Sequence, residues 1–242
     1  MGDLESFAQR LAKHPEVQIT GLMTHLACAD AEEGHAESGF TAEQVARFEE
    51  ATRRLVRSGA ISEGTMRHAA NSAALLRGDA LFDAVRPGIA IFGVSPLPGD
   101  PRPSGELRAA MCVRSEIVDV RTLEPGERVG YGALFRVSRR SRIATIPMGY
   151  ADGLSRQLSN RGHVLVRGRR APVVGAVSMD MSMIDVTDVP GAETSDEVVV
   201  LGAQDGVLGK DAITADEIAV HAGTIAWEVM TSISRRVPRF YR

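Results

Sequence analysis

The sequence predicts an α/β fold in which a parallel βα part is followed by a mainly antiparallel β part. Up to about residue 94, helical and strand patterns alternate, which is typical of parallel strands covered by helices. Beyond about residue 107, short β-branched runs are separated by glycine, proline and asparagine, which indicates antiparallel strands. Residues 95–106 hold four prolines and two glycines and are predicted to form an exposed connector between the two parts.

The first part contains about three βα units, with strands predicted at residues 18–27, 66–70 and 84–94. The first strand presents Thr24 and His25 at its end. The second strand runs into a polar turn that begins a helix at Asn71, and the third carries Arg86. A closed barrel needs eight such units in about 250 residues, so three units cannot close one.

A helix is predicted at residues 41–58, between the first two strands. Thr41 and Gln44 have the spacing of a capping box. One helix face is apolar, and Gly59 is suited to end the helix.

The second part is predicted to contain short strands, at residues 111–120, 141–147, 164–167, 172–177, 179–186 and 198–201. Near the end of the chain, Thr214 and Glu217 form another capping-box pattern. The helix that follows is predicted to be long, with one apolar face made of Ile218, Ala222, Ile225 and Val229.

Composition excludes several classes of protein. The chain of 242 residues is 44% hydrophobic, which is normal for a globular protein with a core, and its net charge of −3 gives no nucleic-acid footprint. Cys28 and Cys112 are far apart and form no metal-binding motif, so a reduced, cytoplasmic setting is expected. Neither a signal peptide nor a membrane span is expected. The arginine-rich runs at 139–142, 167–170 and 235–239 are interpreted as solvated turns or strand edges.

Four clusters between residues 129 and 180 indicate a site. Tyr131 and Tyr150 each stand next to glycine, which lets the backbone turn and lets another surface approach closely. The other two clusters are Asn160-Arg161-Gly162 and Ser178-Met179-Asp180. One Gly-Tyr pair alone would indicate only a turn, but four clusters in one β-rich region favour a site.

In parallel α/β units, ligand-binding groups gather at the carboxyl ends of the strands. Ser72 and the amides of Gly88 and Ile89 could bind a phosphate there, although serine and glycine in such loops usually only turn the chain. At a strand end, His25 is more often a hydrogen-bonded structural imidazole than a catalyst, and Arg86 could equally be paired with a surface carboxylate. Core packing is the expected role of at least two of three alternating methionines, Met179, Met181 and Met183.

Taken in order, the motifs resemble alanine racemase over essentially the whole chain. They are Thr24-His25, residues 68–74 and 85–93, Gly130-Tyr131-Gly132, residues 149–153 and 159–162, Met179-Asp180, and residues 236–239. The resemblance implies a partial (β/α) TIM-type barrel at residues 1–100, which binds pyridoxal 5′-phosphate, and a β-rich domain at residues 107–242. It implies interconversion of L-alanine and D-alanine through an aldimine of that cofactor, which supplies D-alanine for cell-wall peptidoglycan.

The resemblance also implies roles for single residues. Tyr131 is similar to the tyrosine that removes the α-proton of L-alanine, and residues like His25 and Arg86 link that tyrosine to the cofactor ring, with the arginine facing the pyridine nitrogen. Cofactor phosphate contacts are expected from Ser72, Gly88, Ile89 and Trp227, where Trp227 takes the place of a tyrosine that is usual in the family. Met179 is expected to hold the substrate carboxylate and Tyr150 to narrow the entrance. Alanine is the expected small-molecule substrate. A homodimer is also expected, in which each active site is shared between the two subunits.

The sequence departs from the family in its lysines. Only Lys13 and Lys210 are present, and neither matches the lysine that forms the Schiff base in the family. We therefore expect a truncated or split racemase, which an N-terminal half supplied in trans would complete. The alternatives are a non-catalytic remnant that retains weak phosphate affinity and a racemase for another amino acid. An open set of three parallel strands would also expose unpaired edges, which predicts poor solubility or association.

Overall fold

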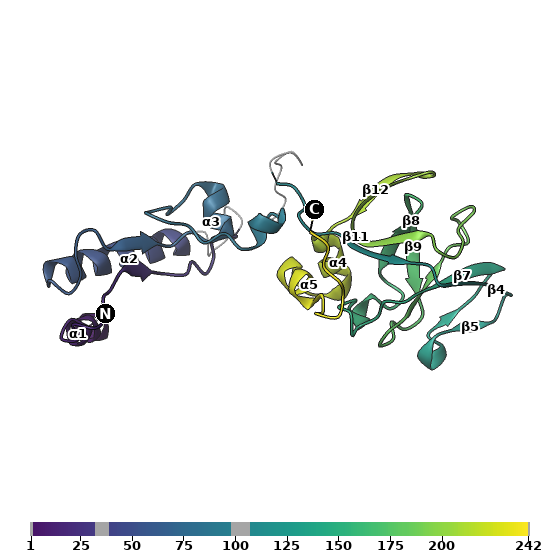
Figure 1. Ribbon diagram of the computed structural model, residues 1–242, viewed down its shortest axis with the longest axis horizontal. Coiled ribbons are helices and arrows are strands. Elements are labelled where there is room, and N and C mark those ends of the chain that lie inside the picture. The colour runs from purple at the N-terminus through teal and green to yellow at the C-terminus, as the bar shows by residue number, and fades with distance from the viewer. Residues whose placement is uncertain (1, 32–38, 98–106, 242) are drawn as a thin grey trace. The chain divides into compact units, whose positions relative to one another are not determined.

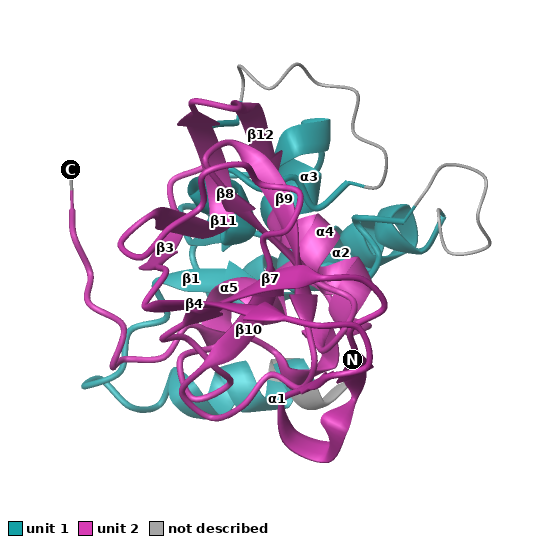
Figure 2. Cartoon of the chain, turned by 90° about the vertical axis from the view of Figure 1, so that its right-hand side faces the viewer, with its two compact units in different colours: residues 1–108 teal, residues 109–242 magenta. Residues whose placement is uncertain are grey.

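The computed structural model describes residues 2–31, 39–97 and 107–241, which divide into two compact units, Met1–Arg108 and Ala109–Arg242 (Figure 1). Figure 2 shows the two units in different colours. Most of the predicted connector at 95–106 lies outside the described residues. None of the helices in the described ranges is both long and apolar enough to cross a membrane.

Unit 1 contains the expected parallel strands. Its elements are α1 (Gly2–Leu11), β1 (Gly21–Met23), α2 (Phe40–Arg57), β2 (Met66–His68), α3 (Ser72–Arg77) and the 3-10 helix η1 (Ile89–Phe92). β1 pairs with β2 in parallel, from Gly21 opposite Met66 to Met23 opposite His68. One further parallel bridge joins His68 to Ala84.

Two predicted strands of unit 1 differ from the structure. The strand predicted at 18–27 is only three residues long, and the strand predicted at 84–94 is reduced to the bridge at Ala84. Pro87 has no N–H to donate to a ladder, and the Gly88 N–H donates to the Ser72 hydroxyl instead of to a strand. The chain therefore turns away and forms η1.

The helix α2 confirms the predicted location, but its predicted capping box is wrong. Gly39 is the N-cap and provides no side-chain hydrogen bond, while the Thr41 hydroxyl is buried without a partner. The Gln44 side chain instead accepts a hydrogen bond from the Ala27 amide at 3.1 Å and donates to the His25 carbonyl. It thus fixes the loop that follows β1.

Unit 2 is built on an antiparallel sheet, as predicted. The order is β12-β11-β8-β9-β10-β7-β4, and β3 also pairs with β11. The strands are β3 (Val113–Glu116), β4 (Asp119–Leu123), β7 (Ser141–Ile146), β8 (His163–Val166), β9 (Arg169–Val174), β10 (Ser182–Asp185), β11 (Glu197–Gly206) and β12 (Gly209–Ile213). Two short strands, β5 (Arg128–Val129) and β6 (Phe135–Arg136), form a separate hairpin. Buried Leu165, Ile184 and Val198 lie in the core of the unit.

The predicted elements of unit 2 need two corrections. The run at 111–120 forms two strands, β3 and β4, because β3 pairs with β11 whereas β4 pairs with β7. The long C-terminal helix is two helices, α4 (Ala215–Ala222) and α5 (Ala226–Ser232), which lie side by side (Figure 1). Gly223 ends α4 with a φ of +68°, and Ile225, expected on the apolar face, is 60% exposed.

The arginine run at 167–170 is also more ordered than predicted. Arg167 forms a two-pronged ion pair with Asp196, with N–O distances of 2.7 and 3.2 Å. Arg170, on β9, binds Asp211 of β12 and Glu217 of α4. These arginines therefore connect elements of the unit and are not merely solvated.

Candidate functional site

A tight turn exposes Tyr131 on unit 2. Gly130 and Gly132, on either side of it, have φ angles of +73° and +68°, which L side chains rarely adopt. A Cβ at Gly130 would meet the Met183 methyl at 3.0 Å and the Ala176 amide nitrogen at 3.2 Å. Tyr131, the residue between these glycines, is 77% exposed. Its phenol is therefore available to a ligand and is not part of the core.

A second turn places Tyr150 beside Met179. A Cβ at Gly149 would lie only 2.2 Å from the Ser178 carbonyl oxygen and 2.4 Å from that of Met179. Only glycine allows this approach, and the two segments are then joined by hydrogen bonds. The Tyr150 amide donates to the Ser178 carbonyl at 2.9 Å, and the Ala151 amide donates to the Met179 carbonyl at 3.0 Å.

The cluster around Asn160 holds both turns in place. Asn160 has a φ of +58°, and its amide donates to the Leu134 carbonyl at 3.2 Å, just after the Tyr131 turn. Its side-chain oxygen accepts from the Gly175 amide at 2.6 Å, and the Ser159 hydroxyl accepts from the Val177 amide at 3.0 Å. The segment that leads to Met179 is thereby fixed relative to the turn that carries the phenol.

These segments line one open cleft of about 700 Å³. Its wall consists of Tyr131, Tyr150, Arg156 and residues 176–181. Three residues that the sequence singled out, Tyr131, Tyr150 and Met179, thus come together although up to 48 positions separate them in the sequence. A cleft with two phenols, a guanidinium and exposed backbone is suited to a small polar ligand.

Arg236 anchors the rim of this cleft from the C-terminal segment. Its guanidinium donates to Asp152 at 2.6 Å and to Asp180 at 2.5 Å. The hydrogen bonds that Arg236 donates to Asp152 and Asp180 raise the pKa of Arg236 above its ordinary value. The other oxygen of Asp152 accepts from the Gly149 amide at 2.8 Å, so one arginine steadies both the Tyr150 turn and the Asp180 rim.

On unit 1, the Ser72 hydroxyl lies against the backbone amides of the loop before η1. The Ser72 side chain is buried at the start of α3, and its hydroxyl oxygen accepts from the Gly88 amide at 2.8 Å and from the Ala90 amide at 3.3 Å. A Cβ at Gly88 would meet no atom within 4 Å, so there is open space beside this backbone. Ile89 is buried, and its amide belongs to the same turn.

Arg86 is held by backbone carbonyls and by a histidine. It donates to the Thr24 carbonyl at 2.9 Å, to the Ala69 carbonyl at 3.2 Å and to Nδ1 of His68 at 2.7 Å. A guanidinium can only donate, so the Nδ1 atom of His68 accepts and carries no proton. This network, and not a surface carboxylate, fixes Arg86, with further N–H groups left for a ligand.

The remaining predicted residues lie at exposed positions. His25 follows β1 with an exposed side chain, and Trp227 lies in the first turn of α5 with 39% of its surface exposed. Lys13 is exposed after α1, and Lys210 lies in β12, where it pairs with Asp205 at 3.4 Å. Neither lysine lines the cleft.

The prediction that at least two of the three alternating methionines pack in the core is wrong. Met179 and Met181 are 52% and 51% exposed, and only Met183 packs against a buried cluster, that of Val129 and Val174. The alternating pattern failed because β10 begins at Ser182, so Met179 and Met181 belong to the loop before the strand.

Sequence reasoning assigned no role to two residues of these sites. His68 belongs to one of the sequence motifs, but the sequence alone assigns it no role. Its hydrogen bond to Arg86 connects positions 18 residues apart, which no local pattern reveals. Arg156 lines the cleft from η3 (Arg156–Leu158). It resembles any exposed arginine in sequence, so no signal could have found it.

Comparisons with known families cover nearly the whole chain. Residues 110–241 match the family model of the alanine racemase C-terminal domain, and residues 1–96 match that of the alanine racemase N-terminal domain. An alanine racemase of Sorangium cellulosum is 58% identical over 241 residues, which are 99% of this chain and 61% of that protein. The chain thus spans about three fifths of the length of that relative.

Solved structures show the same similarity. The alanine racemase of Bacillus anthracis with bound L-Ala-P superposes with a TM-score of 0.84 at 31% identity, over 100% of this chain and 60% of that one. The alanine racemase of Bartonella henselae, with covalently bound pyridoxal phosphate, superposes with a TM-score of 0.78 at 31% identity, over 97% and 61% of the two chains. The predicted fold class, a partial barrel followed by an antiparallel β domain, agrees with these neighbours.

Proposed function

Because this chain belongs to the alanine racemase family, we propose that it takes part in the interconversion of L-alanine and D-alanine with pyridoxal 5′-phosphate as cofactor. The observation that carries the proposal is the cleft that unites Tyr131, Tyr150 and Met179 on unit 2. D-alanine made in this way would serve cell-wall peptidoglycan. In this proposal residues 1–100 are the cofactor-binding portion of the barrel and residues 107–242 the β-rich domain.

The residues of unit 1 fit the proposed cofactor. The Ser72 hydroxyl and the amides of Gly88 and Ile89 would contact a phosphate, for which the Gly88 amide would exchange its hydrogen bond to the Ser72 oxygen, and the open space beside Gly88 leaves room for the phosphate oxygens. Arg86 would face the pyridine nitrogen with a permanently positive group. Because His68 and two carbonyls hold it, the guanidinium is oriented before the ligand arrives. Trp227 would add an indole N–H donor toward the phosphate.

When bound, the cofactor would supply an electron sink that acidifies the α-carbon of the amino acid. Tyr131 would take the α-proton on its phenolic oxygen, with His25 and Arg86 connecting it to the cofactor ring. The Met179 backbone would orient the substrate carboxylate, and Tyr150 would narrow the entrance so that small side chains are favoured. The turns around Gly130 and Gly149 would hold these groups rigidly enough for proton transfer.

We further propose that the working site is shared within a homodimer. Tyr131 stands on an open surface of unit 2, while the phosphate donors belong to unit 1. Exchange of the α-proton on both faces of the substrate also requires a second base. Neither Lys13 nor Lys210 lies in the cleft. The proposal therefore includes a lysine from outside these 242 residues. Two free cysteines fit a cytoplasmic location.

The experiment uses this chain coexpressed with the part of the Sorangium cellulosum relative that the match does not cover. Formation of D-alanine from L-alanine is measured together with cofactor absorbance. Tyr131→Phe is expected to lower the rate by about 10²-fold or more without loss of cofactor. The matched control, Tyr241→Phe, alters a terminal and exposed phenol and should leave the rate unchanged. A Tyr131→Phe rate equal to wild type would refute the assigned role.

A further inference from the structure

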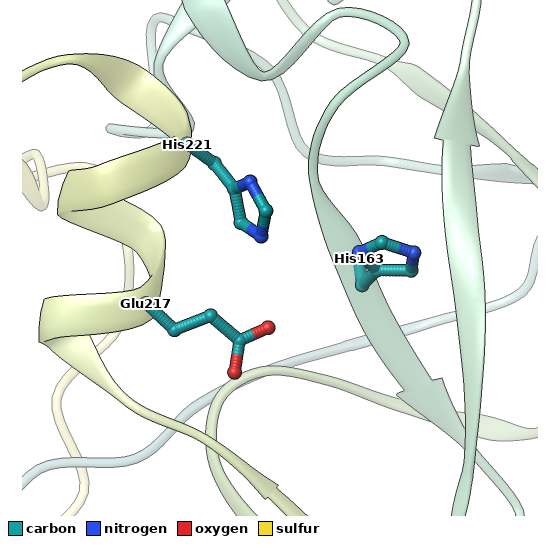
Figure 3. A group of neighbouring side chains, drawn as sticks. All are labelled: His163, Glu217 and His221. Atoms are coloured by element: carbon teal, nitrogen blue, oxygen red, sulfur yellow. The ribbon is translucent and has the colours of Figure 1, made fainter.

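Away from the cleft residues, three metal-binding side chains converge between a helix and a strand of unit 2. His163 begins β8, while Glu217 and His221 lie on α4 four positions apart and therefore on one face of that helix. One ligand atom from each of the three lies within 4.8 Å of the other two. Figure 3 shows the two helix side chains pointing across the gap toward the ring of His163.

The His163 ring has an unused nitrogen. Its Nδ1 atom is buried and has no hydrogen-bond partner. A buried polar atom without a partner costs stability, so a ligand at this position would remove that cost. Burial lowers the pKa of His163, and the positive charge of Arg170 lowers it further. The neutral imidazole is the form that coordinates a metal.

The second histidine is close but does not stack on the first. The ring centroids of His163 and His221 are 5.9 Å apart, with an angle of 53° between the planes. The tilted arrangement leaves the edges of both rings, where the nitrogens lie, directed into the same gap (Figure 3). The contact between the two rings does not explain why the Glu217 carboxylate lies beside them.

Glu217 is oriented by a hydrogen-bonded support. Arg170 of β9 binds both of its carboxylate oxygens, and Asp211 of β12 binds Arg170 in turn. A carboxylate has about four lone-pair positions, so the two contacts with Arg170 leave others free for a cation. The charges of Arg170, Glu217 and Asp211 sum to −1, which favours a positive ligand.

The donor set selects a class of cation. Two imidazole nitrogens and one carboxylate oxygen suit zinc and similar transition metals, whereas Mg²⁺ and Ca²⁺ prefer oxygen ligands. Atoms no more than 4.8 Å apart all lie within about 2.8 Å of one common point, while zinc bonds are about 2.0–2.2 Å long. Side-chain movements of under about 1 Å therefore suffice, with water as a fourth ligand.

We propose that His163, Glu217 and His221 form a binding site for a divalent transition-metal ion of the zinc class, which pins α4 to the edge of β8. The site is structural, because none of its three residues lines the cleft that holds Tyr131. It is also independent of the proposed racemase activity. A bound ion would connect β8 to α4, an element that Arg170 already links to β9 and β12.

The test is calorimetric titration of Zn²⁺ into the full chain after treatment with a chelator. Wild-type protein should bind one ion per chain, with a rise in Tm that Mg²⁺ does not produce. His221→Gln should weaken binding at least about tenfold, and circular dichroism checks that the variant is folded. His14→Gln is the matched control, because His14 is an exposed histidine beside a carboxylate, Glu16.

A second measurement needs no variant. In imidazole nitrogen NMR spectra of the wild-type chain, Zn²⁺ should shift the signals of His163 and His221 and leave that of His14 in place. The proposal is overturned if Zn²⁺ shows no saturable binding or if the His163 and His221 signals do not move. It is equally overturned if His221→Gln binds as tightly as the His14→Gln control.

Discussion

Single backbone positions determine the shape of the cleft. Gly149 excludes any Cβ because two carbonyl oxygens lie within 2.4 Å of where it would stand. Asn160, with a positive φ, uses its short amide to join the turn after Tyr131 to the segment at Gly175. The sequence predicted that glycine beside Tyr131 and Tyr150 marks a site. It could not predict which carbonyl opposes Gly149, because that partner lies 29 positions further along the chain.

The ion pair of Asp196 with Arg167 leads to a pH-dependent prediction. Burial of Asp196 would raise the pKa of its carboxyl, but hydrogen bonds from Arg167 and from the Glu193 amide outweigh burial and hold that pKa below the ordinary 3.8. The unfolded chain therefore binds the proton more readily than the folded chain. The pair stabilises the fold above about pH 4, and this contribution is lost as the pH falls through the folded pKa.

Asp196→Asn should lower the free energy of unfolding at pH 7 by about 1–3 kcal/mol, with the difference shrinking as the pH falls through the lowered pKa of folded Asp196. Urea unfolding at a series of pH values measures it. Asp205→Asn is the control, because Asp205 pairs with Lys210 on the surface with both side chains about three-quarters exposed. Such a pair contributes about 0–1 kcal/mol. A pH-independent loss for Asp196→Asn would contradict the electrostatic explanation.

Helix starts show how far local sequence patterns reach. The sequence has the spacing of a capping box both at Thr41 and Gln44 and at Thr214 and Glu217. Thr214 is the N-cap of α4, and its hydroxyl accepts from the Glu217 amide at 3.1 Å. Thr41 lies inside α2, where its hydroxyl has no partner, because Gln44 binds the loop at residues 24–27. Local spacing is identical in the two places, and tertiary contacts decide which is a cap.

We expect opposite outcomes for the two threonines. Thr214→Ala should lower the free energy of unfolding of unit 2 by about 1 kcal/mol, because it leaves an amide without its acceptor. Thr41→Val should be neutral or stabilising, since it replaces an unsatisfied hydroxyl by a methyl group. Hydrogen exchange of α4 and α2 amides reports each effect locally. A loss at Thr41 equal to that at Thr214 would show that Thr41 caps its helix after all.

The strand pattern has the same limits as the helix pattern. The runs at 141–147 and 164–167 became β7 and β8 because their apolar residues, such as Ile143, Ile146, Val164 and Val166, are buried in a well-paired sheet. The run at 84–94 failed because Pro87 and the Ser72 hydroxyl remove the donors that a ladder needs. Strand β12 was missed because Gly209-Lys210-Asp211 has no β-branched residue, although its backbone pairs with β11.

At the scale of the whole molecule, the two units differ in how completely their sheets are formed. Unit 2 has eight strands in one antiparallel sheet, with fully buried residues such as Ile146, Leu165 and Ile184. The described part of unit 1 pairs β1 with β2, three residues each, adds one bridge from His68 to Ala84, and leaves Met23 and Met66 of those strands about half exposed. Two paired strands are marginal in water, and three or more are needed for independent stability.

We therefore expect residues 109–242 to fold alone and residues 1–108 to fail to do so. The isolated unit 2 should give a dispersed amide NMR spectrum and a single cooperative unfolding transition, because every strand of its sheet finds its partner within the unit. The isolated unit 1 should give a poorly dispersed spectrum or associate, because its strands offer unpaired edges and exposed methionines. A poorly dispersed amide NMR spectrum for residues 109–242 would mean that the antiparallel sheet depends on unit 1 for its stability.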